Sequence, residues 1–392
     1  MVGGFCTLED AALAGKRVLL RVDLNVPMKN GAVSDATRLE RVTPTIAEIA
    51  DKGGKVILLS HLGRPKGRDA ALSLRPVATA LAAMLNRPVG FVEDCVGPAA
   101  HAAVAAMQPG DIVCLENTRF HGGEESNDQA FVAALAELGD LWINDAFSAA
   151  HRAHASTEGL GHLLPAYAGR AMQAELHALG KALETPEHPV MAIVGGAKVS
   201  SKAGVLRFLL PRVDALLLGG AMANTFFKAA GKEVGASLVE DQALDTARAV
   251  EREGGGKLVL PVDAVCARAV EPGQETVVRP VDGVDDGWMI VDAGPATIRR
   301  FAERLQDAGT VIWNGPVGVF EVPEFSEGTR AVGEAVAASG AYSLVGGGDT
   351  AAAVEALGLS GRFSHVSTGG GATLEYMEGR ELPGVAVLRD RR

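Results

Sequence analysis

Short runs of apolar residues, rich in Val, Ile and Leu, recur along the chain, with Ala-rich stretches between them. Most of these runs are apolar at every position rather than at alternate ones, the pattern of parallel strands buried on both faces. The expected strands cover residues 17–24, 55–62, 89–92, 111–116, 141–147, 190–195, 215–219, 257–262, 310–314, 342–346 and 365–368. Helical stretches such as 76–86, 128–138 and 350–357 lie between strands. This alternation predicts an α/β fold with doubly wound parallel sheets.

Eleven strands are too many for one ordinary open sheet, so the pattern predicts two sheets in two domains. A length of 392 residues favours the same division. Residues 170–183 form one uninterrupted amphipathic pattern, and Pro186 and Pro189 follow it closely. We therefore expect domains over 1–170 and 186–381, with a linking helix and hinge over 171–185. An ordinary surface helix within one domain is the alternative.

Composition narrows the function classes. With 47% hydrophobic and 22% charged residues, the chain is neither collagen-like, coiled-coil nor disordered. A formal net charge of −11 disfavours nucleic acid or an anionic membrane as a partner. The four cysteines form no CxxC pair, which predicts neither a disulfide framework nor a zinc site and fits a reducing cytoplasm. The sequence shows no secretory signal and no apolar run of the roughly 18–20 residues that a membrane helix needs.

Positively charged side chains follow the expected strands of the first half. Because ligands of open α/β sheets bind at the carboxyl ends of strands, these side chains can converge. They are Arg38, His61, Arg64, Arg119 and Arg152. A cluster of arginines, which bind anions bidentately, predicts a pocket for a small, multiply charged anion. For a single arginine, exposure to solvent or an ion pair with Asp23, Glu116 or Asp145 is the alternative.

A metal site at His151 and His154 is a weaker alternative, because no carboxylate or cysteine stands in ligand spacing.

Glycine-rich segments follow the expected strands of the second half. They are VGGAKVSSK, LGGAMANTF, WNGPVGVFE, GGGDT and STGGGA. Glycines let backbone N–H groups approach a phosphate, so the pattern predicts a nucleotide with its diphosphate on helix N-termini. Lys198 and Lys202 would face one way if their segment were helical. Asp349 is the expected Mg²⁺ ligand. Neither a GxxxxGK[ST] motif nor an HRD and DFG pair is present, so P-loop NTPases and protein kinases are excluded.

Two other function classes remain open at this point. Gly346, Gly348 and Ala351 imitate a dinucleotide-binding fingerprint between a strand and a helix, although no acidic residue follows at the expected distance. A non-enzymatic two-domain binding protein is the other alternative, but it needs only one ligand. Turnover of ATP against a phosphorylated acid would separate the three classes.

Nine motifs in order resemble the phosphoglycerate kinase family. They are RVDLNVP, SHLGRP, LENTRF, NDAFSAAHRAHAS, VGGAKVSSK, LGGAMANTF, WNGPVGVFE, GGGDT and HVSTGGGA, from about residue 17 to residue 375. The resemblance implies two Rossmann-like domains joined by a helix, with a cleft between them. It also implies Mg²⁺-dependent, reversible phosphoryl transfer between ATP and 3-phosphoglycerate, which gives 1,3-bisphosphoglycerate and ADP. The enzyme would be a cytoplasmic monomer of glycolysis whose domains close by hinge bending. The segment over about 382–392 would pack on the N-terminal domain.

The resemblance also implies roles for individual residues. The 3-phosphoglycerate site would comprise Asp23, Leu24, Asn25, Arg38, His61, Leu62, Gly63, Arg64, Arg119 and Arg152. The nucleotide site would comprise Lys198, Lys202, Gly219, Asn314, Glu321, Gly347, Gly348, Asp349 and Thr350, with Asp349 on Mg²⁺. Arg38, Lys198 and the backbone amides of Gly370 and Gly371 would meet the transferring phosphoryl group. Its acceptor is already a carboxylate, so positioning and charge neutralisation would supply the catalysis.

Overall fold

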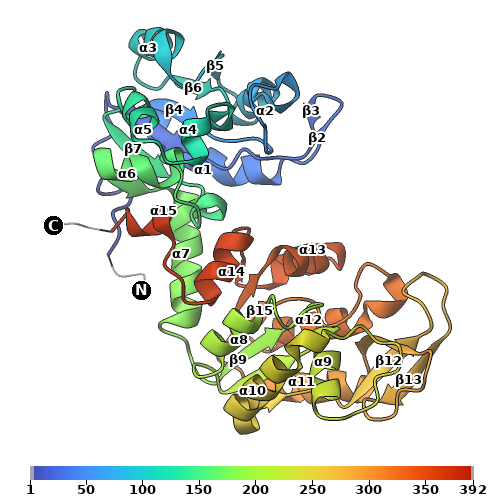
Figure 1. Cartoon of the computed structure of the whole chain (residues 1–392). Helices are drawn as coiled ribbons and strands as arrows, with labels where there is room; N and C mark the ends of the chain where they lie inside the picture. The colour runs from blue at the N-terminus through green and yellow to red at the C-terminus, as the bar shows by residue number, and fades with distance from the viewer. Residues whose placement is uncertain (1–3, 390–392) are drawn as a thin grey trace. The chain divides into compact units, whose positions relative to one another are not determined.

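The chain folds into two compact units in the computed structural model, which describes residues 4–389 (Figure 1). Unit 1 runs to His177 and also includes the segment that begins at Glu381, whereas unit 2 is Ala178–Arg380. No helix in the described part of the chain is long and apolar enough to cross a membrane.

Unit 1 is built on a six-stranded parallel sheet in the order β5-β6-β4-β1-β7-β8. The strands are β1 Arg17–Arg21, β4 Lys55–Leu59, β5 Gly90–Val92, β6 Ile112–Leu115, β7 Leu141–Asn144 and β8 Ala166–Ala168. The helices are α1 Thr37–Asp51, α2 Arg75–Leu85, α3 Gly97–Ala106, α4 Gly122–Glu125, α5 Gln129–Ala136, α6 Leu160–Leu163 and α15 Pro383–Ala386. Helix α7 Arg170–Leu183 begins in unit 1 and ends in unit 2. A short hairpin pairs β2 Met28–Lys29 with β3 Ala32–Val33.

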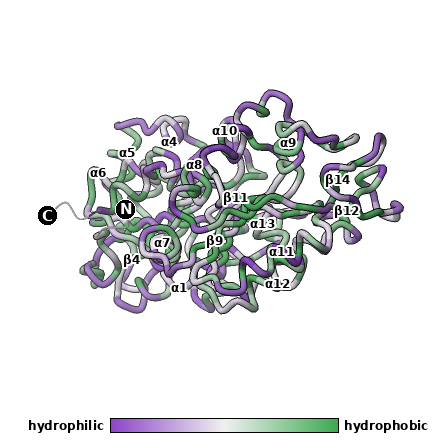
Figure 2. The backbone as a smooth tube through the Cα atoms, turned by 90° about the horizontal axis from the view of Figure 1, so that it is seen from below, coloured by the Kyte–Doolittle hydropathy of each residue, from purple (hydrophilic) through white to green (hydrophobic). Residues whose placement is uncertain are grey.

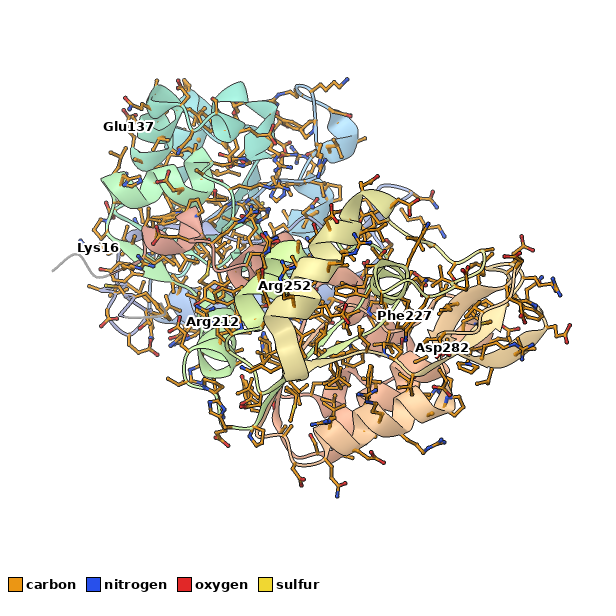
Figure 3. All side chains as sticks on the ribbon, turned by 60° about the horizontal axis from the view of Figure 1, so that its bottom comes forward. Lys16, Glu137, Arg212, Phe227, Arg252 and Asp282 are labelled. Atoms are coloured by element: carbon orange, nitrogen blue, oxygen red, sulfur yellow. The ribbon has the colours of Figure 1, made fainter. Side chains whose placement is uncertain are left out.

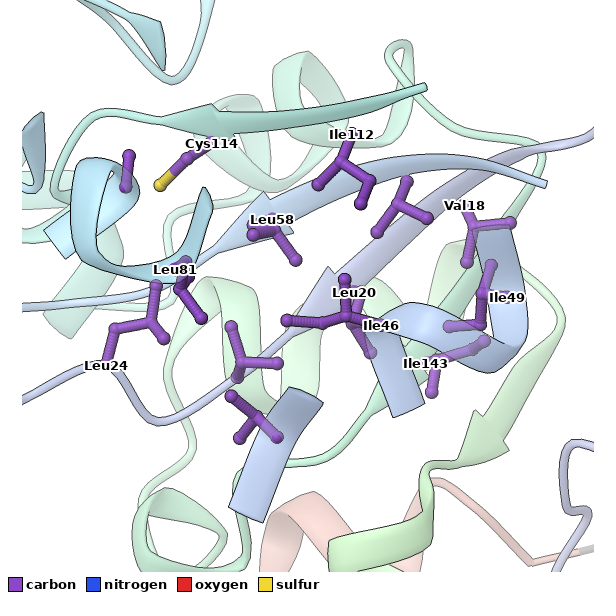
Figure 4. Close-up of a cluster of buried hydrophobic side chains, with 14 of the residues drawn as sticks. Val18, Leu20, Leu24, Ile46, Ile49, Leu58, Leu81, Ile112, Cys114 and Ile143 are labelled. Atoms are coloured by element: carbon purple, nitrogen blue, oxygen red, sulfur yellow. The ribbon is translucent and has the colours of Figure 1, made fainter. Parts of the chain in front are cut away.

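The core of unit 1 lies where α1 and α2 cover one face of this sheet (Figure 4). Apolar residues recur every three or four positions along α1, so Leu39, Val42, Ile46 and Ile49 share one face and are all buried. They pack in one cluster with residues of the central strands such as Leu20, which is fully buried. This packing fixes the strand ends that carry the charged residues.

Unit 2 repeats the plan with a second six-stranded parallel sheet, in the order β11-β10-β9-β15-β16-β17. Its strands are β9 Val190–Val194, β10 Ala215–Leu218, β11 Leu258–Val259, β15 Thr310–Asn314, β16 Tyr342–Gly346 and β17 His365–Val366. The helices are α8 Ala203–Leu209, α9 Met222–Ala229, α10 Leu244–Gly254, α11 Pro295–Leu305, α12 Glu327–Ala338, α13 Gly348–Ala356 and α14 Gly371–Met377. Strands such as β9 are hydrophobic throughout (Figure 2).

The predicted α/β class with two doubly wound parallel sheets is confirmed. All eleven expected strands are present, most of them a few residues shorter than predicted. A three-stranded antiparallel sheet was not predicted: β12 Asp263–Ala267 pairs with both β13 Thr276–Pro280 and β14 Met289–Ala293. Strand β8 and the β2–β3 hairpin were also missed.

The C-terminal segment of the described chain packs on unit 1. The N–H of Gly384 donates to the carbonyl of Ala150 at 2.8 Å, and Asn144 Nδ2 donates to the Gly384 carbonyl at 3.0 Å. The N–H of Cys6 donates to the carbonyl of Leu388 at 3.1 Å. Residues 390–392 of the segment expected over 382–392 lie outside the described residues.

Helix α7 begins against a buried carboxyl group. Asp145, which follows β7, accepts a hydrogen bond from the N–H of Met172 at 3.0 Å. A side chain at Gly169 would lie 2.3 Å from Asp145 Oδ1, so only glycine lets the chain turn into the helix here. Burial raises the pKa of Asp145 to about 7.

This pKa predicts how the stability of an Asp145→Asn variant depends on pH. Ionisation of Asp145 is harder in the folded than in the unfolded state, so its contribution to stability falls as pH rises from about 4 to about 7. Asparagine can still accept the Met172 hydrogen bond but does not ionise. Urea unfolding at pH 5 and pH 8 should therefore show Asp145→Asn gaining stability relative to the wild type at the higher pH. Equal differences at both pH values would contradict this.

Candidate active site

The charged residues predicted to bind an anion lie at the carboxyl ends of four adjacent strands of unit 1. Asp23 and Asn25 follow β1, His61–Arg64 follow β4, Arg119 follows β6 and Arg152 follows β7. Arg38 lies in the first turn of α1. Because these strands are neighbours in the order β6-β4-β1-β7, their ends share one edge of the sheet.

Arg38 is held beside the first of these strand ends. Its Nη1 donates to Asp23 Oδ2 at 2.9 Å and to the carbonyl of Asn25 at 3.0 Å. The Asp23 carboxylate also accepts from Ser148 Oγ and, at 3.0 Å, from the N–H of Asn25. Only part of the Arg38 fork is therefore occupied, and its side chain is 40% exposed. The guanidinium is positioned yet can still meet an anion from solvent.

His61 is oriented by a buried arginine that the sequence analysis did not assign to the site. Arg21, the last residue of β1, is 1% exposed, and its Nη2 lies 2.8 Å from His61 Nδ1. Because arginine only donates, Nδ1 must accept, and the imidazole proton therefore sits on Nε2. Burial and the neighbouring Arg21, Arg119 and Arg152 charges hold the pKa of His61 well below its usual value. His61 is thus a neutral hydrogen-bond donor.

Arg21 is itself compensated by a buried carboxyl. Its Nε donates to Ser156 Oγ at 2.9 Å, and Ser156 Oγ donates to Glu124 Oε1 at 2.6 Å. Glu124 is 1% exposed, and burial raises its pKa. The sequence signal that could have identified Arg21 is an arginine that directly follows the apolar residues Val18, Leu19 and Leu20 of β1.

The remaining arginines also converge. Arg119 Nη1 donates to the carbonyl of Gly63 at 2.7 Å, and burial together with the Arg152 and Arg64 charges lowers the pKa of Arg119. Burial and the charges of Arg119, Arg152 and Arg21 lower the pKa of His154 to about 4. Arg152 Nε donates to His151 Nε2 at 3.2 Å. The edge of the sheet therefore concentrates positive charge around neutral histidines, an environment for an anion rather than for a cation.

The glycine-rich segments of unit 2 meet through their backbones. The N–H of Gly195 donates to the carbonyl of Asn314 at 2.9 Å, and the N–H of Gly196 donates to that of Pro316 at 3.1 Å. The N–H of Gly220 donates to the carbonyl of Val317 at 3.1 Å. A Cβ on Gly195 would lie 2.1 Å from the Pro316 carbonyl oxygen. The loops after β9, β10 and β15 can pack this closely only because side chains are absent.

A polar network joins the ends of β15 and β16. Lys202 Nζ donates to Asn314 Oδ1, and Asn314 Nδ2 donates to the Gly346 carbonyl at 3.1 Å. Thr350 Oγ1 accepts from the N–H of Gly315 at 2.6 Å. Gly347, at φ +94°, turns the chain into α13, whose first turn carries Gly348 and Asp349. The expected nucleotide residues Asn314, Lys202 and Thr350 thus lie in one network.

Lys198 and Lys202 do not share a helical face, because the helix on which that expectation depended does not form here. Residues 195–202 form a loop, and α8 begins only at Ala203. Hydrogen bonds from Ser200, with a smaller contribution from the Lys198 charge, lower the pKa of Glu240. Burial lowers the pKa of Lys202, and the charges of Asp349 and Glu378 oppose that shift. The backbone hydrogen bonds of the Gly195–Gly196 segment run to the β15 loop, which prevents a helical turn here.

A pocket of about 350 Å³ opens beside this network. Glu321 and Asp349 line it, as do Gly196, Gly220 and the aromatic ring of Phe227, which is labelled in Figure 3. Gly219 packs against Val317. Gly370 and Gly371 lie at the start of α14, outside the pocket lining.

The sequence analysis missed Asp292, a buried carboxyl that also lines the pocket from β14. It accepts hydrogen bonds from the N–H groups of Gly328 and Ala293 at 2.7 and 2.8 Å. Burial raises its pKa to about 7. Asp292 thereby fixes the start of α12, and the unpredicted antiparallel sheet contributes a wall of the pocket.

Comparisons with known proteins agree on one family. The model of the family described as phosphoglycerate kinase matches residues 8–380. A phosphoglycerate kinase of Bradyrhizobium diazoefficiens is 57% identical over 396 residues, 99% of this chain and 100% of that protein. Solved phosphoglycerate kinases from Coxiella burnetii and Pyrococcus horikoshii have TM-scores of 0.92 and 0.84, with 42% and 32% identity. Each covers 98% of this chain and 98% of its own.

Proposed function

The chain belongs to the phosphoglycerate kinase family, and from that premise we propose that it catalyses reversible phosphoryl transfer between MgATP and 3-phosphoglycerate. The products are ADP and 1,3-bisphosphoglycerate, and in glycolysis the reaction runs toward ATP. Family membership excludes the dehydrogenase and the purely binding protein considered above. The observation that carries the proposal is the cluster of Arg38, Arg64, Arg119, Arg152 and His61 at one sheet edge.

Unit 1 would bind the acid. Arg64, Arg119 and Arg152 would hold the 3-phosphate through bidentate hydrogen bonds, and His61 would donate from Nε2. A neutral His61 suits this role because its donor stays in place at physiological pH. Asp23 and Asn25 would orient Arg38 toward the carboxylate end of the substrate.

Unit 2 would bind the nucleotide, with its diphosphate against the backbone amides at the start of α13. The residues fit a magnesium ion: Asp349 is exposed beside the pocket, and no hydrogen bond to its carboxylate is found among residues 4–389. Mg²⁺, when bound, supplies positive charge to the phosphate oxygens. Lys198, Lys202 and the amides of Gly370 and Gly371 would add further positive charge and donors.

The chemistry requires no general base, because the attacking group is already a carboxylate. A carboxylate oxygen forms a bond to the γ-phosphorus, and the bond from that phosphorus to the bridging oxygen of ADP breaks. Rate enhancement then comes from alignment and from charge neutralisation by Arg38 and the lysines. Water must be excluded, because it would otherwise accept the phosphoryl group.

A coupled assay with ATP, Mg²⁺ and 3-phosphoglycerate tests the proposal. ADP should form only when all three are present, and 2-phosphoglycerate should not replace 3-phosphoglycerate. ADP formation independent of the acid would indicate an ATPase instead.

An Asp349→Asn variant should weaken binding of MgADP more than binding of ADP without metal. Asparagine keeps the shape and one acceptor oxygen but loses the charge that a hard divalent cation favours. Calorimetry with and without Mg²⁺ measures both affinities. Glu355→Gln, which removes an exposed carboxylate elsewhere on α13, is the matched control and should change neither. Equal losses for ADP and MgADP would show that Asp349 contacts the nucleotide or only the helix.

We also propose that the two units close on each other when both substrates are bound, with α7 absorbing the rotation. Each ligand contributes only its own preference for the closed state, so the population of that state is largest in the ternary complex. Small-angle scattering should show the smallest radius of gyration with MgADP and 3-phosphoglycerate together. An unchanged radius in the apo, binary and ternary samples would contradict hinge closure.

The same proposal places the enzyme in the cytoplasm as a monomer, with no nucleic-acid or membrane partner. The four cysteines, all free, support the cytoplasm, and the net charge of −11 disfavours nucleic acid and anionic membranes. The monomer follows from the resemblance to the family alone.

A further inference from the structure

Three side chains with metal-binding atoms meet in unit 1, on loops that follow its first two strands in the sheet order. Asp94 and Cys95 follow β5, and His121 comes directly after the short 3₁₀ helix Thr118–Phe120 that follows β6. Strands β5 and β6 are parallel neighbours, so their carboxyl ends lie together. One carboxylate oxygen, the thiol sulfur and one ring nitrogen all lie within 4.8 Å of one another.

The Asp94 and His121 side chains are held in place by their neighbours, and Cys95 is buried beside them. Asp94 Oδ2 is paired with Arg68 Nη2 at 3.0 Å, which leaves Oδ1 facing His121 Nε2 at 2.7 Å. The His121 ring stacks on Phe131 with centroids 5.1 Å apart. Cys95 is 1% exposed, and its N–H donates to Asp94 Oδ1 at 2.8 Å. Supporting contacts of this kind are what orient ligands in metal sites.

We propose that Asp94, Cys95 and His121 bind a thiophilic divalent transition-metal ion of the Zn²⁺ class. Carboxylate oxygen, thiolate sulfur and imidazole nitrogen together form a ligand set that zinc accepts, and a water molecule would complete a tetrahedron. A thiolate disfavours Mg²⁺ and Ca²⁺, which prefer oxygen ligands. The site is therefore separate in chemistry and in unit from the proposed Mg²⁺ ligand Asp349.

Binding requires a defined proton balance. The metal–sulfur bond replaces the S–H bond, and the thiol proton passes to solvent. The metal–nitrogen bond replaces the hydrogen bond between His121 Nε2 and Asp94, and the single proton of the neutral imidazole moves through solvent from Nε2 to Nδ1. Neither oxidation nor reduction takes place.

The ion would act on the anion-binding loop, because His121 is only two residues from Arg119. An ion that joins the β5 and β6 loops binds the folded protein and not the separated ligands of an unfolded chain. It should therefore raise the thermal midpoint as its concentration exceeds the dissociation constant.

Titration of the full-length protein with Co²⁺ tests the proposal without reference to activity. Cobalt bound to a thiolate gives a sulfur-to-metal charge-transfer band in the near ultraviolet, which cobalt at an all-oxygen site such as Asp349 cannot give. The band should saturate at one ion per chain, disappear with EDTA and be displaced by Zn²⁺. Absence of the band in the folded wild-type protein would overturn the proposal.

Two variants and two controls assign the ligands. Cys95→Ser should abolish the band. Loss of an outer contact already weakens metal binding about 10–100-fold, so His121→Gln, which loses a ligand, should raise the dissociation constant at least about 100-fold. The controls are Cys6→Ser, at a partly exposed cysteine outside the cluster, and His101→Gln, on α3; both should keep the wild-type band.

Circular dichroism establishes that each variant is folded. A band that persists in Cys95→Ser, or one that Cys6→Ser removes, would show that another thiol binds the ion. If Cys95→Ser does not fold, His121→Gln provides the test, because His121 is only half-buried. An unchanged affinity of folded His121→Gln for Co²⁺ would also contradict the site.

Discussion

An Arg38→Ala variant is expected to lose about 10²–10³-fold in kcat while its affinity for MgADP stays close to that of the wild type. The expected loss is that of one preorganised donor acting on charge in the transition state. Arg38 belongs to unit 1, and the pocket proposed for the nucleotide is lined by unit 2 residues alone, which is why nucleotide binding should survive. Steady-state kinetics and ADP calorimetry measure the two quantities.

The structure also predicts that this variant folds. Asp23 would keep its hydrogen bonds from Ser148 and Asn25, and Arg38 is too exposed for its ion pair to contribute more than about 1 kcal/mol. Arg38→Lys should recover only part of the rate, because it restores the charge without the planar fork. Arg75→Ala, at an exposed arginine of α2 paired with Glu93, is the control and should be fully active. A loss below about fivefold in Arg38→Ala would remove Arg38 from the catalytic residues.

Among the variants considered, Gly195→Ala should lose the most stability against thermal unfolding. Its Cβ would stand 2.1 Å from the Pro316 oxygen and 2.7 Å from that of Gly315, and both obstacles are backbone atoms that cannot rotate away. Overpacking typically costs 1–3 kcal/mol, and a backbone obstacle places this case at about 3 kcal/mol or more. For a unit of this size that corresponds to roughly 6–12 °C in the thermal midpoint. The loops after β9, β10 and β15 would also move apart, so ADP binding should weaken.

Gly256→Ala provides the matched control. Gly256 belongs to the same unit, has no left-handed backbone angle, and nothing lies within 4 Å of the position that a Cβ would take there. Its midpoint should stay within about 2 °C of the wild type, as for most surface substitutions. A Gly195→Ala midpoint that matches the control would mean that the loops after β9 and β15 tolerate separation.

The parallel sheets could be predicted because their strands are continuous apolar runs, which is a local property. Strand β13 is different: its half-buried and exposed positions alternate, and a five-residue stretch of that kind is a weak signal beside the continuous apolar runs. The 257–262 run was extended too far, since β11 stops at Val259 and a new strand begins at Asp263. Strand β8 has only three residues, Ala166–Ala168, and its place is set by pairing with β7.

The anion cluster could be predicted because strand order places sequence-distant residues at one edge. The role of Arg21 could not be predicted from the sequence, because it depends on burial and on contacts with Ser156 and His61, which are far away in sequence. Asp292 could not be predicted for the same reason, since the hydrogen bond that it accepts from the N–H of Gly328 spans 36 residues. For Lys198 and Lys202 the sequence left the local structure open: their spacing would place them on one face only in a helix, and the loop contacts prevent that helix.

The return of the chain to unit 1 has a consequence for biosynthesis. Unit 2 is inserted, in the order of the sequence, between two parts of unit 1. A ribosome therefore completes unit 2 before it has made Gly384 and Leu388, whose backbone groups bond with Asn144, Ala150 and Cys6. Until then the nascent unit 1 lacks these hydrogen bonds, so unit 1, although it begins first, is the last of the two units to complete its contacts.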